Sequence, residues 1–239
     1  MLQKIFLRVA SEILLSGSIP CESQNIARTV LDGLPTACPD QSVGLIGKFD
    51  SYQDFSRISL KGDYIGAPDA EGCVVLVLES PHTSEYRTKN GRLIPIGPAN
   101  GCTGCRIRRY FNSITKGKYD KYEMILVNVI QYPCSLGIGR DMGGVNLKAK
   151  ILRRLLPLKK SSDEKIPAFE KNFYDRMEEA LSLSLRNSVV FACTNLLKER
   201  VCNRLRSMNF FMNLVSTCLA TCHPSLWNNN TKVNELLID

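Results

Sequence analysis

Long apolar runs are absent from this chain of 239 residues, and so is any strong compositional bias. No stretch approaches the roughly 20 consecutive apolar residues of a membrane-spanning helix, so we expect no membrane partner. Hydrophobic residues make up 44% and charged residues 23%, which excludes collagen, coiled coil and intrinsic disorder as the main state. A chain of this length can bury a full core without disulfides or metal staples.

We also expect no secretory signal, because Arg8 and Glu12 interrupt the apolar N-terminal segment. We therefore expect the ten cysteines to be free thiols in a reducing cytoplasm. Cys102 and Cys105 form a C-x-x-C pair, but no second pair with zinc-finger spacing accompanies it. The sequence predicts neither a metal site nor a cofactor.

Acidic residues are outnumbered: 31 Lys and Arg face 23 Asp and Glu, a net charge of +8. This excess favours an anionic partner, with nucleic acid first. One basic group comprises Arg106, Arg108, Arg109, Lys116, Lys118 and Lys121. A second comprises Arg140, Lys148, Lys150, Arg153, Arg154, Lys159 and Lys160. A run of this kind on its own is usually a solvent-exposed helix face. If a DNA-binding site lies next to it, contacts with the phosphates of the nucleic acid are the better explanation.

Residues 1–60 have the pattern of an N-terminal helical extension. Apolar residues at spacings of three and four predict a helix over 2–14, and a second short helix is predicted over 26–34. We interpret this section as a packing layer or an interaction surface. Residues 61–239 are predicted to form the main domain.

Short apolar runs alternate with helical patterns from residue 73 onward. Strands are predicted at 73–78, 124–130, 188–193 and 215–220, and helices at 106–114, 145–156, 169–185 and 196–208. This alternation predicts an α/β fold, a three-layer α/β/α sandwich around a mostly parallel four-stranded sheet. Ligands of such sheets bind at the carboxyl ends of the strands.

Polar clusters follow three of the predicted strands. They lie at residues 79–82 (E-S-P-H), at Asn128, and at residues 223–227 (H-P-S-L-W). Residues 91–101 are rich in glycine and proline, and we expect a loop whose backbone can approach a flat ligand or a phosphate closely.

These motifs occur along residues 70–230 in the same order as in the uracil-DNA glycosylase superfamily, which this part of the chain resembles. Residues 78–82 are similar to the first motif of its G-E-x-P-G branch, and Glu85 matches a second acid. The glycines of 91–101, Asn128 after the second strand and the H-P-S of 223–225 follow in the family's order. Leu78, Ser80 and His82 depart from the usual motif residues, and the cysteines of the iron–sulfur branch are missing.

The resemblance implies a role for each matched residue. Glu79 would orient water, His223 would stabilise the departing base, and Asn128 would read the edge of a pyrimidine. The other implied substrate contacts are Ser80, Pro81, His82, Gly97, Ala99 and Ser225. Leu226 and Trp227 would fill the gap left by a flipped base. Arg140, Arg153 and Arg154 would contact DNA.

The expected function is that of a monomeric, monofunctional DNA glycosylase acting on single- or double-stranded DNA. Because His82 can hydrogen-bond a 5-substituent, we expect a modified or damaged pyrimidine as substrate, with defence against phage DNA as one role. Three alternatives stay open: ordinary uracil repair, a non-catalytic DNA binder on the same fold, and an unrelated small-molecule hydrolase.

Overall fold

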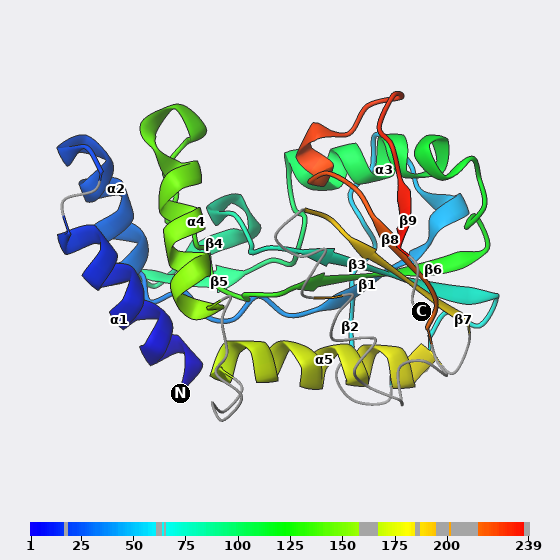
Figure 1. Cartoon of the computed structure of the whole chain (residues 1–239), viewed down its shortest axis with the longest axis horizontal. Coiled ribbons are helices and arrows are strands. Elements are labelled where there is room, and N and C mark those ends of the chain that lie inside the picture. The colour runs from blue at the N-terminus through cyan, green and yellow to red at the C-terminus, as the bar shows by residue number, and fades with distance from the viewer. Residues whose placement is uncertain are drawn as a thin grey trace. The chain divides into compact units, whose positions relative to one another are not determined.

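The chain folds into two compact units, each built from three segments (Figure 1). The computed structural model describes residues 1–16, 19–60, 64, 66–157, 167–184, 187–194, 201 and 215–236. A helical unit comprises Met1–Cys38, Ser80–Ile96 and Val129–Tyr174, and a sheet unit comprises Pro39–Glu79, Gly97–Asn128 and Asp175–Asp239. The predicted boundary at residue 60 is therefore wrong, because residues 39–59 contribute two strands to the sheet unit.

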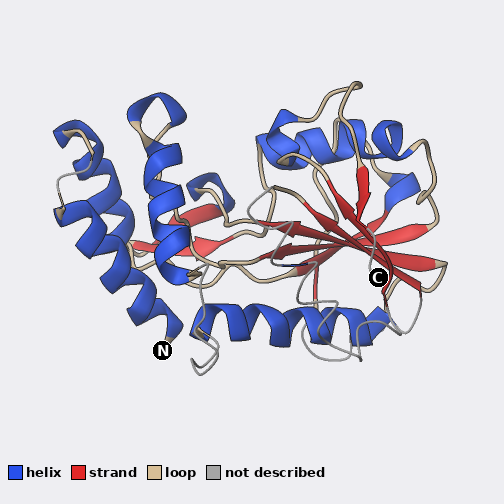
Figure 2. Ribbon diagram, in the orientation of Figure 1, coloured by secondary structure: helices blue, strands red, loops and turns tan. Residues whose placement is uncertain are grey.

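The sheet unit contains a mixed sheet of seven strands in the order β2-β1-β6-β3-β7-β8-β9 (Figure 2). Four central strands run parallel: β6 (Tyr122–Asn128), β3 (Gly72–Leu78), β7 (Asn187–Ala192) and β8 (Val215–Ala220). Each flanking strand pairs antiparallel with its inner neighbour: β1 (Gln41–Leu45) with β6, β2 (Ile58–Ser59) with β1, and β9 (Asn234–Leu236) with β8.

The α/β class is confirmed, and each predicted strand overlaps one of the four parallel strands. The prediction of a four-stranded sheet is wrong, because three short edge strands extend it. These strands have two to five residues and lack a continuous apolar run, so the hydrophobic pattern did not indicate them. The helix predicted over 196–208 lies outside the described residues except for Val201.

β3 shows why the centre of the sheet is so apolar. All seven of its residues are buried, as expected for a parallel strand covered on both faces. Within the sheet unit, α3 (Cys102–Thr115) lies on one side of the sheet (Figure 2). The part of α5 (Ala168–Ser184) that follows residue 174 lies on the other side.

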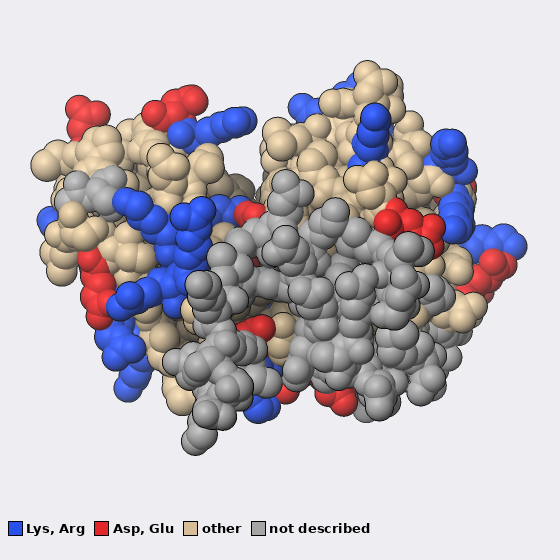
Figure 3. Space-filling model, viewed as in Figure 1, with Lys and Arg blue, Asp and Glu red and all other residues tan. Residues whose placement is uncertain are grey.

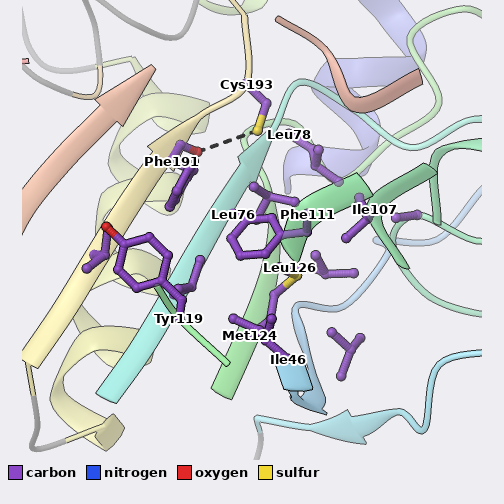
Figure 4. Close-up of a cluster of buried hydrophobic side chains, with 14 of the residues drawn as sticks. Ile46, Leu76, Leu78, Ile107, Phe111, Tyr119, Met124, Leu126, Phe191 and Cys193 are labelled. Carbon is purple, nitrogen blue, oxygen red and sulfur yellow. Dashed lines mark hydrogen bonds between the residues drawn. The ribbon is translucent and has the colours of Figure 1, made fainter. Parts of the chain in front are cut away.

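The core between the sheet and α3 is drawn in Figure 4. Leu76 and Leu78 of β3 lie on this side, together with Met124 and Leu126 of β6. Since side chains alternate along a strand, the next residue of β6 with this orientation is Asn128. The core therefore leads directly to the carboxyl edge of the parallel strands.

The helical unit contains α1 (Leu2–Leu15), α2 (Cys21–Asp32), α4 (Gly144–Leu155), the first part of α5 and the hairpin β4 (Tyr86–Lys89) and β5 (Arg92–Pro95). The helices predicted over 2–14, 26–34, 145–156 and 169–185 are confirmed, with ends shifted by up to five residues. In the described part of the chain, no helix combines the length and apolar character needed to cross a bilayer.

The hairpin corrects the interpretation of residues 91–101 as one loop. Residues 92–95 form β5, and residues 97–101 form a loop that leads into α3. Asn90 and Gly91 make the turn of the hairpin with φ of 51° and 69°. Two successive residues with positive φ are typical of a type I′ turn, for which Asn-Gly is the preferred sequence.

Candidate active site at the carboxyl edge of the parallel strands

Three predicted site residues stand at or just after the ends of parallel strands of the sheet unit. Asn128 ends β6 and pairs in register with Leu78, the residue before Glu79. Ala220 at the end of β8 lies beside Ala192 at the end of β7, which in turn lies beside Val77. Glu79, Asn128 and the segment that leads to His223 therefore start from one edge of the sheet.

The side chain of Asn128 is the clearest sign of a ligand site. Asn128 is 1% exposed, and neither its amide oxygen nor its amide nitrogen has a hydrogen-bond partner among the described residues. An unsatisfied buried polar group costs about 1–3 kcal/mol. A ligand with one donor and one acceptor would recover that cost.

The main chain at Asn128 is held by a buried ion pair. Nη2 of Arg176 donates a hydrogen bond of 2.8 Å to the carbonyl oxygen of Asn128, and Nη1 pairs with the carboxylate of Asp40. Burial raises the pKa of Asp40, and the positive charge of Arg176 opposes this rise. Arg176 and Asp40 hold the main chain at the end of β6, and their separation of 136 residues leaves no local pattern in the sequence.

His223 has a defined tautomer. Its Nδ1 accepts a hydrogen bond of 3.2 Å from the backbone N–H of Ser225 and lies 2.9 Å from the Ser225 hydroxyl. Since Nδ1 accepts, the proton of the neutral ring is on Nε2. Ser225 thus orients the ring and places its proton on Nε2.

Trp227 is a core residue, so its interpretation as a wedge between bases is wrong. It is fully buried and lies 6.0 Å from Phe111, measured between ring centroids. Its indole N–H donates to the carbonyl oxygen of Cys222, and its own carbonyl accepts from Arg106 of α3. These contacts fix the short 3₁₀ helix η4 (Pro224–Leu226) against α3. Leu226 is 54% exposed and stays available as a wedge.

Glu79 is half-buried, and its charge acts on the thiol of Cys193 at the same edge. Burial, followed by the charges of Cys222 and Glu79, raises the pKa of the Cys193 thiol well above its ordinary value. Cys193 is therefore a neutral side chain near pH 7, and it faces the same core as Leu78. Cys222 is exposed.

The loop of residues 97–101 is fixed within the sheet unit. Nη1 of Arg57 donates to the carbonyl of Pro98 at 2.7 Å and to the side chain of Gln41 at 3.1 Å. Gly97 has no room for a Cβ, because these two side chains occupy the space. Ala99 is buried with φ of 53°. Because α3 joins parallel strands β3 and β6, this loop and the start of α3 lie at the carboxyl edge.

Ser80, Pro81 and His82 belong to the helical unit. Nδ1 of His82 accepts a 3.2 Å hydrogen bond from the backbone N–H of Ser84, the same arrangement as in His223. Desolvation of the ring, followed by the positive charge of Lys148, lowers the pKa of His82. The Ser80 hydroxyl is buried without a hydrogen-bond partner in the described part of the chain, and Pro81 is buried.

The basic residues Arg140, Arg153 and Arg154 are exposed on the helical unit. Figure 3 shows Lys and Arg side chains gathered over α4. A shallow, open groove of about 540 Å³ between α1 and α4 is lined by Glu12, Ile13, Ser16, Lys150, Arg153 and Arg154. Lys159 and Lys160 of the predicted basic group lie outside the described residues.

Cys102 and Cys105 begin α3 and are both exposed. Within the described ranges, no group of three or more His, Cys, Asp or Glu side chains could hold a metal ion.

Comparisons with known proteins identify no relative. No protein-family model matches the chain, and no curated protein or solved structure is similar to it. The resemblance to the uracil-DNA glycosylase superfamily therefore remains a prediction that depends on the motifs and on the geometry of the strand edge.

Proposed function

We propose that the protein is a monofunctional DNA glycosylase that hydrolyses the N-glycosidic bond of a flipped pyrimidine and leaves an abasic site. The buried amide of Asn128 is the observation that carries this proposal. It lies at the same strand edge as Glu79 and the segment that leads to His223. The edge of a pyrimidine offers the donor and acceptor that such an amide needs.

The residues at this edge have complementary roles in the proposed reaction. Cleavage develops positive charge on the sugar and negative charge on the base. The Glu79 carboxylate orients a water molecule and accepts its proton as the oxygen bonds to the sugar carbon. The base leaves with the electron pair of the broken bond, and the Nε2–H of His223 donates to its oxygen. Solvent then protonates the free base.

A modified or damaged pyrimidine is the proposed substrate, and phage DNA with 5-substituted cytosines is one source of it. His82 occupies the motif position where a uracil-specific pocket would have a bulky blocking residue. Its Nδ1 is engaged by Ser84, so the neutral ring carries its proton on Nε2 and can donate to a polar substituent. Leu226 would fill the space left by the flipped nucleotide. We propose that the protein acts in the cytoplasm as a monomer.

Base release from a panel of duplexes tests the proposal. The panel contains uracil, 5-hydroxymethylcytosine, its glucosylated form and deaminated purines, with released bases identified by mass. Glu79→Gln and His223→Ala should each slow release by about 100-fold or more. Cys222→Ser is the matched control, since it changes an exposed side chain beside His223 and should leave release intact.

Two outcomes favour the alternatives. Tight, salt-dependent binding without release of any base would indicate a non-catalytic DNA binder, an alternative favoured by Ser80, which stands where many glycosylases have an aspartate or asparagine. Release of uracil alone would indicate ordinary repair.

A further inference from the structure

The hairpin β4–β5 presents three cations on one exposed face. Arg87 and Lys89 of β4 and Arg92 of β5 are all exposed, and Lys89 lies directly opposite Arg92. Since side chains alternate along a strand, the three share one face of the hairpin. The opposite face carries Tyr86 and Leu93, which are buried and half-buried.

This arrangement is unfavourable for the protein alone. Like charges directly opposite each other in an antiparallel pair are destabilising. Among the described residues, no carboxylate forms an ion pair with Arg87, Lys89 or Arg92. A polyanion bound to this face would remove the repulsion.

Hydrogen bonds also hold both strands of the hairpin to the rest of the helical unit. The N–H of Leu93 donates to the carbonyl of Gly33 at 2.8 Å, and the carbonyl of Leu93 accepts from the N–H of Thr36 at 3.3 Å. The hydroxyl of Tyr86 donates to the carbonyl of Gln131 at 3.0 Å. The three cations are therefore presented on an ordered ribbon that loses little conformational entropy on binding.

We infer that this face of the hairpin binds the phosphate backbone of duplex DNA, an inference that rests on the proposed action on DNA. Cations two residues apart on a strand are separated by about 6.8 Å, twice the roughly 3.4 Å axial rise per phosphate of one DNA strand. A two-stranded ribbon also fits the major groove. The turn residues Asn90 and Gly91 provide no apolar side chain for insertion into a membrane, which favours DNA over a lipid surface.

The test measures affinity for a fluorescent duplex over a series of salt concentrations. The double variant Lys89→Gln/Arg92→Gln should bind at least about tenfold more weakly, and the slope of log affinity against log salt should fall by about 2. Its melting temperature should equal or exceed that of the wild type, because a repulsive pair is removed. The matched control Lys4→Gln/Arg28→Gln removes two exposed charges from α1 and α2 and should bind with a salt slope near that of the wild type.

Unchanged affinity and salt slope in the hairpin variant, or failure of the wild type to bind duplex DNA, would overturn the inference. Loss of binding to phosphatidylserine vesicles without loss of DNA binding would assign the face to a membrane instead. Base release is measured separately. If the hairpin variant weakens DNA binding but the wild type releases no base, the proposed glycosylase activity is refuted and the hairpin's role stands. If the wild type releases a base but the hairpin variant binds DNA as tightly as the wild type, the hairpin's role is refuted and the glycosylase activity stands.

Discussion

Arg176 hydrogen-bonds to the main chain of Asn128 across 48 residues of sequence, and it does so while paired with Asp40. Both charged side chains are nearly buried, at 12% and 8% exposure. The end of β6 is thus fixed by a group that has no contact role in the proposed chemistry. Its rigidity supports the site, since a buried side chain can select a ligand only if its backbone is held in place.

Arg176→Met should therefore be strongly destabilising. It leaves the Asp40 carboxylate buried without its cation, a change that typically costs about 3–5 kcal/mol. Unfolding in urea measures the loss. The double variant Asp40→Asn/Arg176→Met should be less destabilised than Arg176→Met alone, and an equal loss in both would show that the ion pair is not the cause.

The pH dependence of stability should report Asp40. Because its folded-state pKa is raised above the ordinary value of 3.8, ionisation favours the unfolded state. The contribution of Asp40 is fully present below pH 3.8 and is lost as pH rises through the folded-state pKa. The free energy of unfolding of the wild type should therefore fall relative to Asp40→Asn as pH rises from about 3.8. If the free energy of unfolding of the wild type instead rises relative to Asp40→Asn over this pH range, Arg176 lowers the pKa of Asp40 by more than burial raises it.

Asn128→Leu should separate stability from function. Replacing a buried amide that has no partner among the described residues with an apolar side chain of similar size should leave the free energy of unfolding unchanged or raise it by about 1 kcal/mol. Base release should fall by about 100-fold or more, because the pyrimidine edge loses its partner. A variant that is strongly destabilised would instead indicate a structural role for the amide.

Trp227 and Leu226 should respond differently to truncation. Trp227→Ala removes a fully buried side chain and should cost about 3–5 kcal/mol of stability. Leu226→Ala changes an exposed side chain and should leave the melting temperature nearly unchanged while weakening base release from duplex DNA. If Leu226→Ala releases bases from duplex DNA as well as from single-stranded DNA, Leu226 has no role in base flipping.

Charge reversal of Arg153 and Arg154 tests the open basic groove between α1 and α4. Arg153→Glu/Arg154→Glu should weaken DNA binding at low salt and lower the slope of log affinity against log salt. Both residues are exposed, so the fold should persist, as circular dichroism can verify. Unaltered DNA affinity would show that this surface does not follow the DNA backbone.

The sequence predicted the buried centre of the fold better than its edges. Continuous apolar runs such as residues 73–78 indicate parallel strands because both faces are covered. The hairpin was missed because glycines and prolines around residue 91 resemble a loop, although Asn90-Gly91 is itself a hairpin signal. The wedge role of Trp227 came from the resemblance alone, and no local pattern indicates that its ring packs in the core. No local pattern could indicate the pairing of Arg176 with Asp40.

The interleaving of the two units has a consequence for synthesis on the ribosome. β3 lies between β6 and β7, and β7 is made roughly 110 residues after β3 ends. At ordinary rates of translation, that interval is about 5–20 seconds. During it, one edge of the most apolar strand has no neighbour, and unpaired apolar edges favour aggregation. The nascent chain should therefore depend on chaperones until β7 emerges.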